Sequence, residues 1–176
     1  MPEFHCGEND GEPLEILDQT GRVIGLATRG QCHGDPTFAH RAVHVLVRNA
    51  AGELFLQKSA STKHIQPGKW DSSVGGHLLP GESYEVAARR ELEEELGIKA
   101  DQLAYLHDYV WRSEVETEHL RTFMVIAEGP FRLHPDEIDD GRFWSEQELR
   151  QAAGTDILTP NLEEELRRLG ILRPHR

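Results

Sequence analysis

The most informative stretch of the chain is Gly76–Ile98, which reads GHLLPGESYEVAARRELEEELGI. It contains the clearest helix of the chain, over Ser83–Leu96. Ser83 is a suitable N-cap, the interior lacks Gly and Pro, and Gly97 follows at the position where helices commonly end. The sequence therefore predicts a loop that leads from the first glycines of the segment into a helix with defined ends.

One face of this helix is acidic. At about 100° of rotation per residue, an arc of about 100° holds the side chains of Glu91, Glu94 and Glu95. Leu92 and Leu96 lie beside that arc and would bury the helix against a core. Carboxylates that face one way repel one another unless a cation lies among them, and an oxygen-rich site suits Mg²⁺ or Mn²⁺. A solvated helix face with i,i+4 ion pairs is the alternative interpretation.

The spacing around the helix favours the metal site. The segment matches the pattern G-x5-E-x7-R-E-U-x-E-E-x-G-U, with U an aliphatic residue, at Gly76, Glu82, Arg90, Glu91, Leu92, Glu94, Glu95, Gly97 and Ile98. This pattern is the Nudix box, and the chain resembles the Nudix hydrolase superfamily. The resemblance implies a strand-loop-helix-loop unit within an α/β/α sandwich. It also implies hydrolysis of a diphosphate linked to another moiety, X.

The resemblance also implies a metal site. By position, the ligands of the helix would be Glu91, Glu94 and Glu95, and a backbone carbonyl of Gly75 or Gly76 would complete the coordination. The expected ion is Mg²⁺, with Mn²⁺ as the alternative. A metal that bridges phosphate oxygens neutralises charge and lowers the pKa of a bound water.

Two further roles follow from the same resemblance. Glu82 would pair with Arg90 and hold the loop against the helix. Glu91 is the first candidate for the base that takes a proton from water, because a carboxylate beside the metal can do so. Glu137, in the loop before a predicted strand, is the second candidate, and a solvent-exposed loop position is an equally good interpretation of this residue.

The rest of the chain mixes strands and helices. Apolar arms predict an N-terminal hairpin over residues 14–28 and a second hairpin over 42–58. Residues 31–40 are expected to form a loop, and residues 59–76 a long irregular binding loop. Further strands are expected near 103–110 and 122–127. Ser145 would cap a helix, and another would carry its apolar face at Leu162, Leu166 and Leu169.

Without strict βαβ alternation, these elements favour an α+β fold. We expect a Nudix-type α/β/α sandwich with a mixed sheet and an added N-terminal β-hairpin. It would form a single domain over 1–176, with a flexible N-terminus over 1–13, the hairpin over 14–28 and the box over 76–98. The hairpin and the apolar face of the last helix would each be buried in the monomer or pair across a homodimer.

Composition limits the partners. The chain has 176 residues, with 31 Asp+Glu against 19 Lys+Arg, and a formal net charge of −12. This balance argues against binding to a nucleic-acid polymer, and an anionic substrate would need a metal to overcome the repulsion. Apolar runs such as Val43–Val47, which His44 interrupts, are far too short to span a bilayer. Since the first residues do not read as a signal peptide, we expect a cytoplasmic protein without membrane partners.

A broader resemblance, over most of residues 14–127, is to the isopentenyl-diphosphate isomerase-like branch of the superfamily. Its isomerases need a catalytic cysteine within a W-x4-C-G-H pattern and a glutamate on a later strand. Laid on Trp70–His77, that pattern puts Gly75 at the cysteine position, and the later strand puts Leu120 at the glutamate. Because isomerisation needs those acids and bases, we expect no isomerase activity.

The same branch carries a second metal site made of histidines with acidic partners. His33, His40 and His77 match its histidine spacing, and Glu118 would serve as an acidic partner. Three imidazoles with a carboxylate suit Zn²⁺ or Mn²⁺. With ten His in the chain, an accidental match is the competing interpretation.

Three side chains are candidates for substrate binding. Arg29 and Lys63 fall where the isomerases contact the diphosphate, and Trp70 lies beside a glycine in the long loop, where its ring would stack on a base. Cys32 has no recognisable orienting partner, so a structural role is expected for it.

These features predict metal-dependent hydrolysis of a diphosphate bond in a small anionic substrate, such as one linked to a nucleoside diphosphate. The alternative is a non-catalytic nucleotide-sensing module, and isomerase activity is the less favoured reading. The identity of X stays open, because specificity lies in loops that differ between proteins of one fold.

Overall fold

The computed structural model describes residues 10–63 and 66–174. In this part of the chain, nine strands form one mixed sheet and four helices pack around it. The strands are β1 (Pro13–Leu17), β2 (Val23–Thr28), β3 (His40–Arg48), β4 (Leu54–Ser59), β5 (Trp70–Asp71), β6 (Val74–His77), β7 (Ala104–Arg112), β8 (Thr117–Ile126) and β9 (Ile138–Trp144). The helices are α1 (Arg29–Cys32), α2 (Tyr84–Leu96), α3 (Glu146–Ala152) and α4 (Pro160–Arg168).

Strand β3 is the centre of the sheet. β8 runs parallel to it along its whole length, from the pair His40↔Glu118 to Arg48↔Ile126. The opposite edge of β3 is shared in turn by β1, β6 and β4, which pair with successive parts of the strand. β4 and β6 therefore leave the same edge at different points, and the functional cavity described below lies where they separate.

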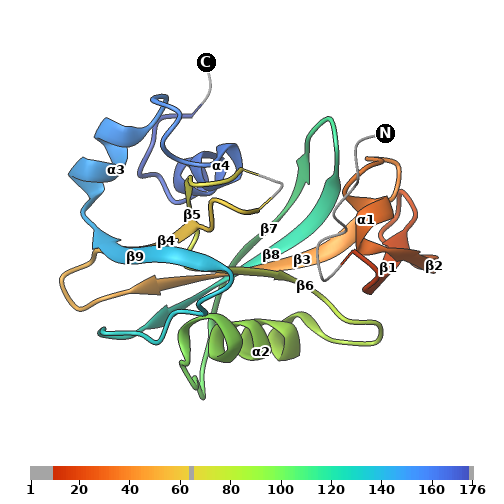
Figure 1. Ribbon diagram of the computed structural model, residues 1–176, viewed down its shortest axis with the longest axis horizontal. Helices are drawn as coiled ribbons and strands as arrows, with labels where there is room; N and C mark the ends of the chain where they lie inside the picture. The colour runs from red at the N-terminus through yellow and green to blue at the C-terminus, as the bar shows by residue number, and fades with distance from the viewer. Residues whose placement is uncertain (1–9, 64–65, 175–176) are drawn as a thin grey trace.

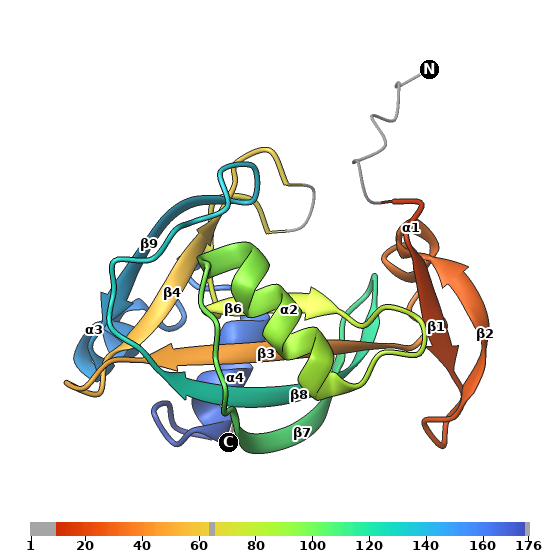
Figure 2. The ribbon, with the colours of Figure 1, turned by 90° about the horizontal axis from the view of Figure 1, so that it is seen from below.

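Helices cover both faces of this sheet, as the two views show (Figures 1 and 2). On one face α2 buries Leu92 and Leu96 against Val43 and Val45 of β3. On the other face α3 and α4 cover a second core that includes Leu46, the β3 residue of opposite orientation. This arrangement is an α/β/α sandwich with a mixed sheet, which confirms the predicted fold class.

The helix ends follow the sequence rules. The Ser83 side chain caps α2, and Gly97 ends it in the left-handed conformation. Ser145 caps α3 and Thr159 caps α4. The apolar face of α4 is buried within the chain itself, since Leu162 and Leu166 are fully covered.

The expected N-terminal hairpin is present, because β1 and β2 pair antiparallel. It joins the sheet through the single pair Ile16↔His40. β2 is the outer strand and exposes Val23, Ile24 and Leu26. Most of the N-terminus expected to be flexible, residues 1–9, lies outside the described residues, whereas Pro13 already belongs to β1.

Three local expectations were wrong. Residues 31–40 were expected to form a loop, but the first of them belong to α1. Thr28 and Gln31 cap the N-terminus of this helix with a capping box. The long irregular segment contains β5, which is only two residues long, and β6, in which two of four residues are glycine, so neither gives a strand pattern. β8 begins at Thr117, five residues before the expected start, and its polar residues Thr117, Glu118 and His119 hid this beginning from an apolar strand pattern.

None of the helices within residues 10–63 and 66–174 is long and apolar enough to cross a membrane.

The core beneath α2 gives a stability prediction. Leu92 is fully buried between the helix and the sheet, so Leu92→Ala should lower the free energy of unfolding by about 2–5 kcal/mol. Glu93→Ala is the matched control on the same helix, because the Glu93 side chain is about half exposed and pairs with the exposed Lys99. Urea denaturation of both variants tests this. A cost for Leu92→Ala no larger than that for Glu93→Ala would contradict the packing.

Candidate active site

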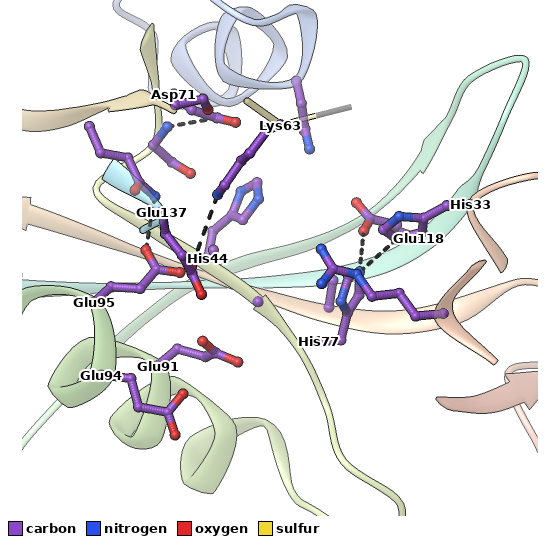
Figure 3. A pocket seen from close by; sticks show the side chains of 18 of the residues that line it. His33, His44, Lys63, Asp71, His77, Glu91, Glu94, Glu95, Glu118 and Glu137 are labelled. Atoms are coloured by element: carbon purple, nitrogen blue, oxygen red, sulfur yellow. Dashed lines mark hydrogen bonds and ion pairs between the residues drawn. The ribbon is translucent and has the colours of Figure 1, made fainter. Parts of the chain in front are cut away.

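A cavity of about 260 Å³ lies where β4 and β6 separate. Its walls come from α1, β3, β4, β6, α2, β8 and α4, so distant parts of the sequence meet there (Figure 3). Of the predicted site residues, it is lined by Arg29, His33, Lys63, Gly75, Gly76, His77, Arg90, Glu91, Glu94, Glu95, Glu118 and Glu137.

The acidic face of α2 points into this cavity at three depths. Glu95 is 4% exposed and accepts a hydrogen bond from Nε2 of Gln57 at 2.9 Å. The Glu91 side chain is 14% exposed and that of Glu94 is 56% exposed. The exposure of the three carboxylates thus rises from Glu95 through Glu91 to Glu94, and Figure 3 shows all three on the same helix.

Arg90 connects the loop after β6 to the helix. Its guanidinium donates to both carboxylate oxygens of Glu82, each at 2.9 Å, and to the backbone carbonyl of His77 at 3.0 Å. It also donates to Oε1 of Glu91 at 2.6 Å. The Glu82 carboxylate in turn accepts from the Leu79 backbone N–H at 2.8 Å. The ion pair expected between Glu82 and Arg90 is therefore present, and it fixes the loop on the helix.

Too few positive charges lie near the buried carboxylates of Glu91 and Glu95 to neutralise both of them. Burial raises the pKa of Glu91 to about 7, even though Arg90 lies beside it. Burial, together with the charges of Glu91 and Glu137, raises the pKa of Glu95 well above its ordinary value. Carboxylate oxygens that repel one another in this way are a suitable donor set for a hard divalent cation. The residues therefore fit the metal that the box implies.

Two consecutive glycines let β6 approach the acidic helix. A Cβ built on Gly76 would lie 2.1 Å from Cδ of Glu91, so any side chain there would displace this carboxylate. A Cβ built on Gly75 would lie 3.2 Å from Cδ2 of His44. Both glycines line the cavity, as the predicted carbonyl ligand requires.

A second cluster of donors lies at the same cavity, which His33, His77 and Glu118 line and behind which His40 is buried. Four of its ligand atoms lie within 4.8 Å of one another, one each from His33, His40, His77 and Glu118. Nε2 of His77 is 3.4 Å and Nε2 of His40 is 3.6 Å from Oε1 of Glu118. Glu116 lies beside this group, with Oε2 3.7 Å from Nε2 of His33. The histidines that match the family's spacing thus lie together with Glu118 in space, which favours a metal site over an accidental match of the sequence pattern.

The protonation of this cluster suits a metal as well. Burial and the neighbouring His77 lower the pKa of His33 to about 3, and burial lowers the pKa of His77. His40 is fully buried and its Nδ1 contacts the Phe38 carbonyl at 3.1 Å, so its Nε2 faces the cluster. This Nε2 has no hydrogen-bond partner within the described residues. Although burial lowers the pKa of His40, Glu118 raises it overall, and a cation would compete with that proton.

Behind the cavity, α4 contributes a buried carboxylate. Glu165 is fully buried and accepts hydrogen bonds from Nε2 of His107 at 2.6 Å, the Tyr109 hydroxyl at 2.9 Å and Nδ1 of His44 at 3.3 Å. The Thr122 hydroxyl adds a fourth at 3.1 Å. Although burial raises it, the bonds from His107 and His44 hold the pKa of Glu165 well below its ordinary value.

Sequence reasoning did not single out His44 or Glu165 as functional. Each leaves a signal, because His44 interrupts the apolar run of β3 and Glu165 lies beside the buried Leu162 and Leu166 of α4. A polar residue at a buried position implies a hydrogen-bond partner. The sequence does not say which partner, since the two residues are 121 positions apart.

Two other expectations need correction. Trp70 does not line the cavity; its ring packs on Trp144 at 5.1 Å between centroids, beside the second core. Leu120 is buried against Ala42 and Tyr109, whereas Glu118, two residues earlier on the same face of β8, lies in the cavity. A carboxylate is therefore present on this strand, and the argument against isomerase activity rests on Gly75.

The remaining candidates are placed as follows. Arg29 and Lys63 line the cavity, and Nζ of Lys63 is 4.0 Å from Oε2 of Glu137. Cys32 is fully buried outside the cavity lining, and burial raises the pKa of its thiol, in keeping with a structural role. Cys6 lies outside the described residues.

Comparison with known proteins is consistent with this geometry. Residues 38–164 match the family model of the NUDIX domain. An uncharacterized Nudix hydrolase of Yersinia pestis is 33% identical over 150 residues, which cover 85% of this chain and 81% of the relative. An isopentenyl-diphosphate Delta-isomerase of Streptomyces avermitilis is 34% identical over 149 residues, which cover 81% of this chain and 76% of the relative.

Among solved structures, DR0079 from Deinococcus radiodurans has a TM-score of 0.77 and 26% identity, covering 89% of this chain and 98% of that protein. A MutT protein from Methanosarcina mazei has a TM-score of 0.64 at 22% identity, over 78% and 94% of the two chains, and shares the fold.

The depressed pKa of Glu165 predicts a pH dependence of stability. A carboxyl group with a lower pKa in the folded state stabilises that state above roughly pH 5, and the contribution is lost as the pH falls. Glu165→Gln removes this contribution, so it should cost about 3 kcal/mol at pH 7 and progressively less between about pH 5 and pH 3. Urea denaturation across this range measures the gap.

Glu164→Gln, the neighbouring position on α4, is the control, because Glu164 pairs with Arg168 near the surface. A gap between the wild type and Glu165→Gln that stays constant with pH would show that the Glu165 carboxylate does not stabilise the fold as an ion.

Proposed function

Because this chain belongs to the NUDIX domain family, we propose that it hydrolyses the diphosphate bond of a small nucleoside-diphosphate-linked substrate with a divalent metal. Hydrolysis of pyrophosphate bonds is the general activity of Nudix hydrolases, and the metal and the class of X are the finer parts of the proposal. The observation that carries it is the convergence of Glu91, Glu94 and Glu95 in one cavity, with Glu95 almost fully buried.

The proposed roles follow from where the side chains lie. Glu91, Glu94 and Glu95 would hold Mg²⁺, or Mn²⁺ in its place, with a backbone carbonyl at Gly75 or Gly76. A bound divalent cation would polarise the diphosphate and lower the pKa of a nearby water. Arg90 is fully engaged in holding Glu82 and Glu91, so we assign it a positioning role.

The proton of the attacking water needs a base. Glu91 is our first choice, because burial already raises its pKa to about 7, near neutral pH. Glu137 lines the same cavity and is the alternative. As water adds to phosphorus, the base takes its proton and the bond from phosphorus to the bridging oxygen breaks. The products are X-monophosphate and the other phosphorylated part of the substrate.

The cavity is acidic, so it would bind a small anionic substrate only together with cations. Carboxylates outnumber basic side chains among its lining residues. Arg29 and Lys63 are the basic side chains that we assign to the substrate, since Arg90 is paired. A diphosphate would otherwise be repelled, so binding should depend on the divalent cation.

We further propose that His33, His40, His77 and Glu118 hold a second divalent ion, with Zn²⁺ or Mn²⁺ suited to imidazole donors. The support is their convergence within 4.8 Å and the buried Nε2 of His40, which makes no hydrogen bond within the described residues. This site and the box carboxylates open to one cavity, so both would act on one bound substrate.

Isomerisation of isopentenyl diphosphate is the second candidate function. It is favoured by relatives that carry this name, such as the protein of Streptomyces avermitilis, and by Glu118 in the cavity. It is opposed by Gly75 at the position of the required thiol, and no cysteine lines the cavity within the described residues. A nucleotide-sensing module without turnover is the other alternative, and the complete set of box carboxylates opposes it.

A substrate screen tests the proposed function. Purified protein with Mg²⁺ should release phosphate, after a coupled phosphatase, from at least one member of a panel of nucleoside-diphosphate-linked compounds. EDTA should abolish the signal. Glu94→Gln and Glu95→Gln should each lower kcat by about 100-fold or more, because each removes a ligand of the proposed metal.

Glu93→Gln is the matched control on the same helix, since its side chain is half exposed and outside the cavity lining, and it should retain full activity. Isopentenyl diphosphate, with detection of its isomer, completes the panel. Activity that survives both Glu94→Gln and Glu95→Gln would contradict the assignment, and isomer formation without hydrolysis would favour the second candidate.

The second metal site has its own test. Calorimetric titration with Mn²⁺ should show two bound ions per chain, and His77→Gln should reduce the number to one without loss of the fold. His119→Gln is the control, because His119 is on β8 next to Glu118 but does not line the cavity. A stoichiometry of one in the wild type, unchanged in His77→Gln, would show that the histidine cluster binds no Mn²⁺.

A further inference from the structure

His44 presents one edge of its ring to the cavity and has no role in the proposed chemistry so far. The residue is 7% exposed on β3, on the sheet face covered by α4, and it lines the cavity. It pairs in register with Gly75, next to the glycine that contacts Glu91, and lies four residues after His40 on the same strand. Its side chain thus lies between the box carboxylates and the histidine cluster (Figure 3).

The other edge of the ring is fixed from behind. Nδ1 donates to Glu165, and a carboxylate can only accept, so the proton of Nδ1 is committed to this bond. Glu165 is itself held by His107, Tyr109 and Thr122 and is fully buried. Within the described part of the chain, Nε2 of His44 makes no hydrogen bond. Nε2 is therefore the atom that a ligand in the cavity can reach.

The backbone opposite His44 makes room for that contact. A Cβ at residue 75 would lie 3.5 Å from Nε2 and 3.2 Å from Cδ2, tight enough to crowd the imidazole edge. Gly75 leaves the edge open to the cavity. Because residue 75 is glycine, Nε2 of His44 faces a space that the side chain of any other residue at position 75 would fill.

The distribution of positive charge indicates what Nε2 would meet. Arg29 acts electrostatically on His33, at the histidine cluster, and Lys63 acts on Glu95, at the box. Near Gly75, between these two ends, the lining residues are small, neutral or acidic, such as Ala42, Ser72 and Asp71. A diphosphate that spans the cavity carries negative oxygens along its length. His44 is the side chain placed to hydrogen-bond them in the middle.

We propose that Nε2 of His44 hydrogen-bonds a phosphate oxygen of the bound diphosphate, and that Glu165 is the positioning residue that orients the ring. This inference deepens the proposed function and rests on it for the class of ligand. Between two anions, Glu165 on one side and the diphosphate on the other, the ring can donate from both nitrogens.

A binding experiment tests the contact without turnover. The probe is methylenediphosphonate, a diphosphate analogue that cannot be hydrolysed at the bridge, titrated calorimetrically in the presence of Mg²⁺. His44→Gln should weaken binding by about tenfold, as expected for loss of one charge-assisted hydrogen bond. His119→Gln is the matched control, because His119 is on β8 and does not line the cavity. Its affinity should stay within about twofold of the wild type.

A second measurement needs no variant. In protein labelled with ¹⁵N at histidine, the ring signal of His44 should shift when the probe is added, and the signal of His107 should not. This result decides the question even where His44→Gln fails to fold, which thermal unfolding would reveal.

Each outcome bears on the assignment. Equal affinity in the wild type and His44→Gln, an equal loss in His119→Gln, an unmoved His44 signal or no binding of the probe by the wild type would each overturn it. Failure of the proposed function looks different. A wild type that hydrolyses no member of the panel, yet binds the probe in a His44-dependent way, would reject hydrolysis and retain the His44 contact.

Discussion

The ion pairs and hydrogen bonds of the Arg90 guanidinium hold together the loop, the strand and the helix that form the site. The guanidinium binds the loop through Glu82, the end of β6 through the His77 carbonyl and the helix through Glu91. Because these contacts use its charge internally, little of it is left for a substrate. In a chain with a net charge of −12, the cavity beside Arg90 remains acidic. The same residue that builds the site would thus make the proposed binding of an anionic substrate depend on added cations.

The closeness of β6 to its neighbours is the second constraint. Gly76 allows Glu91 to lie against the strand, and Gly75 allows His44 to do so. Residues of a strand alternate between its faces, so consecutive glycines clear space on both faces of β6 at once. A cavity that passes from the α2 side of the sheet to the α4 side needs both of them. It is for this reason that the box carboxylates and His44, which contacts the buried Glu165, line one cavity.

The parts of the fold that could be predicted from the sequence are those encoded locally. The ends of α2, the acidic arc and the pair of Glu82 with Arg90 follow from spacing within one segment. Residues far apart in sequence were harder to join. His44 and Glu165 are each conspicuous as polar residues among apolar ones, yet their pairing depends on how α4 packs on β3. Trp70 was expected to stack on a base because it lies beside a glycine in the long loop, whereas its partly buried ring packs on Trp144.

The two donor clusters differ in chemistry, and this difference bears on what separates a hydrolase from an isomerase on one framework. Carboxylates of α2 suit an ion that activates water at phosphorus, whereas imidazoles with Glu118 suit a borderline ion such as Zn²⁺ or Mn²⁺. Both clusters are present, so neither alone selects the reaction. The residues between them must do so. At that point this chain has Gly75 and the edge of His44, which we propose as the contact to the diphosphate and which offer no thiol to protonate or deprotonate carbon.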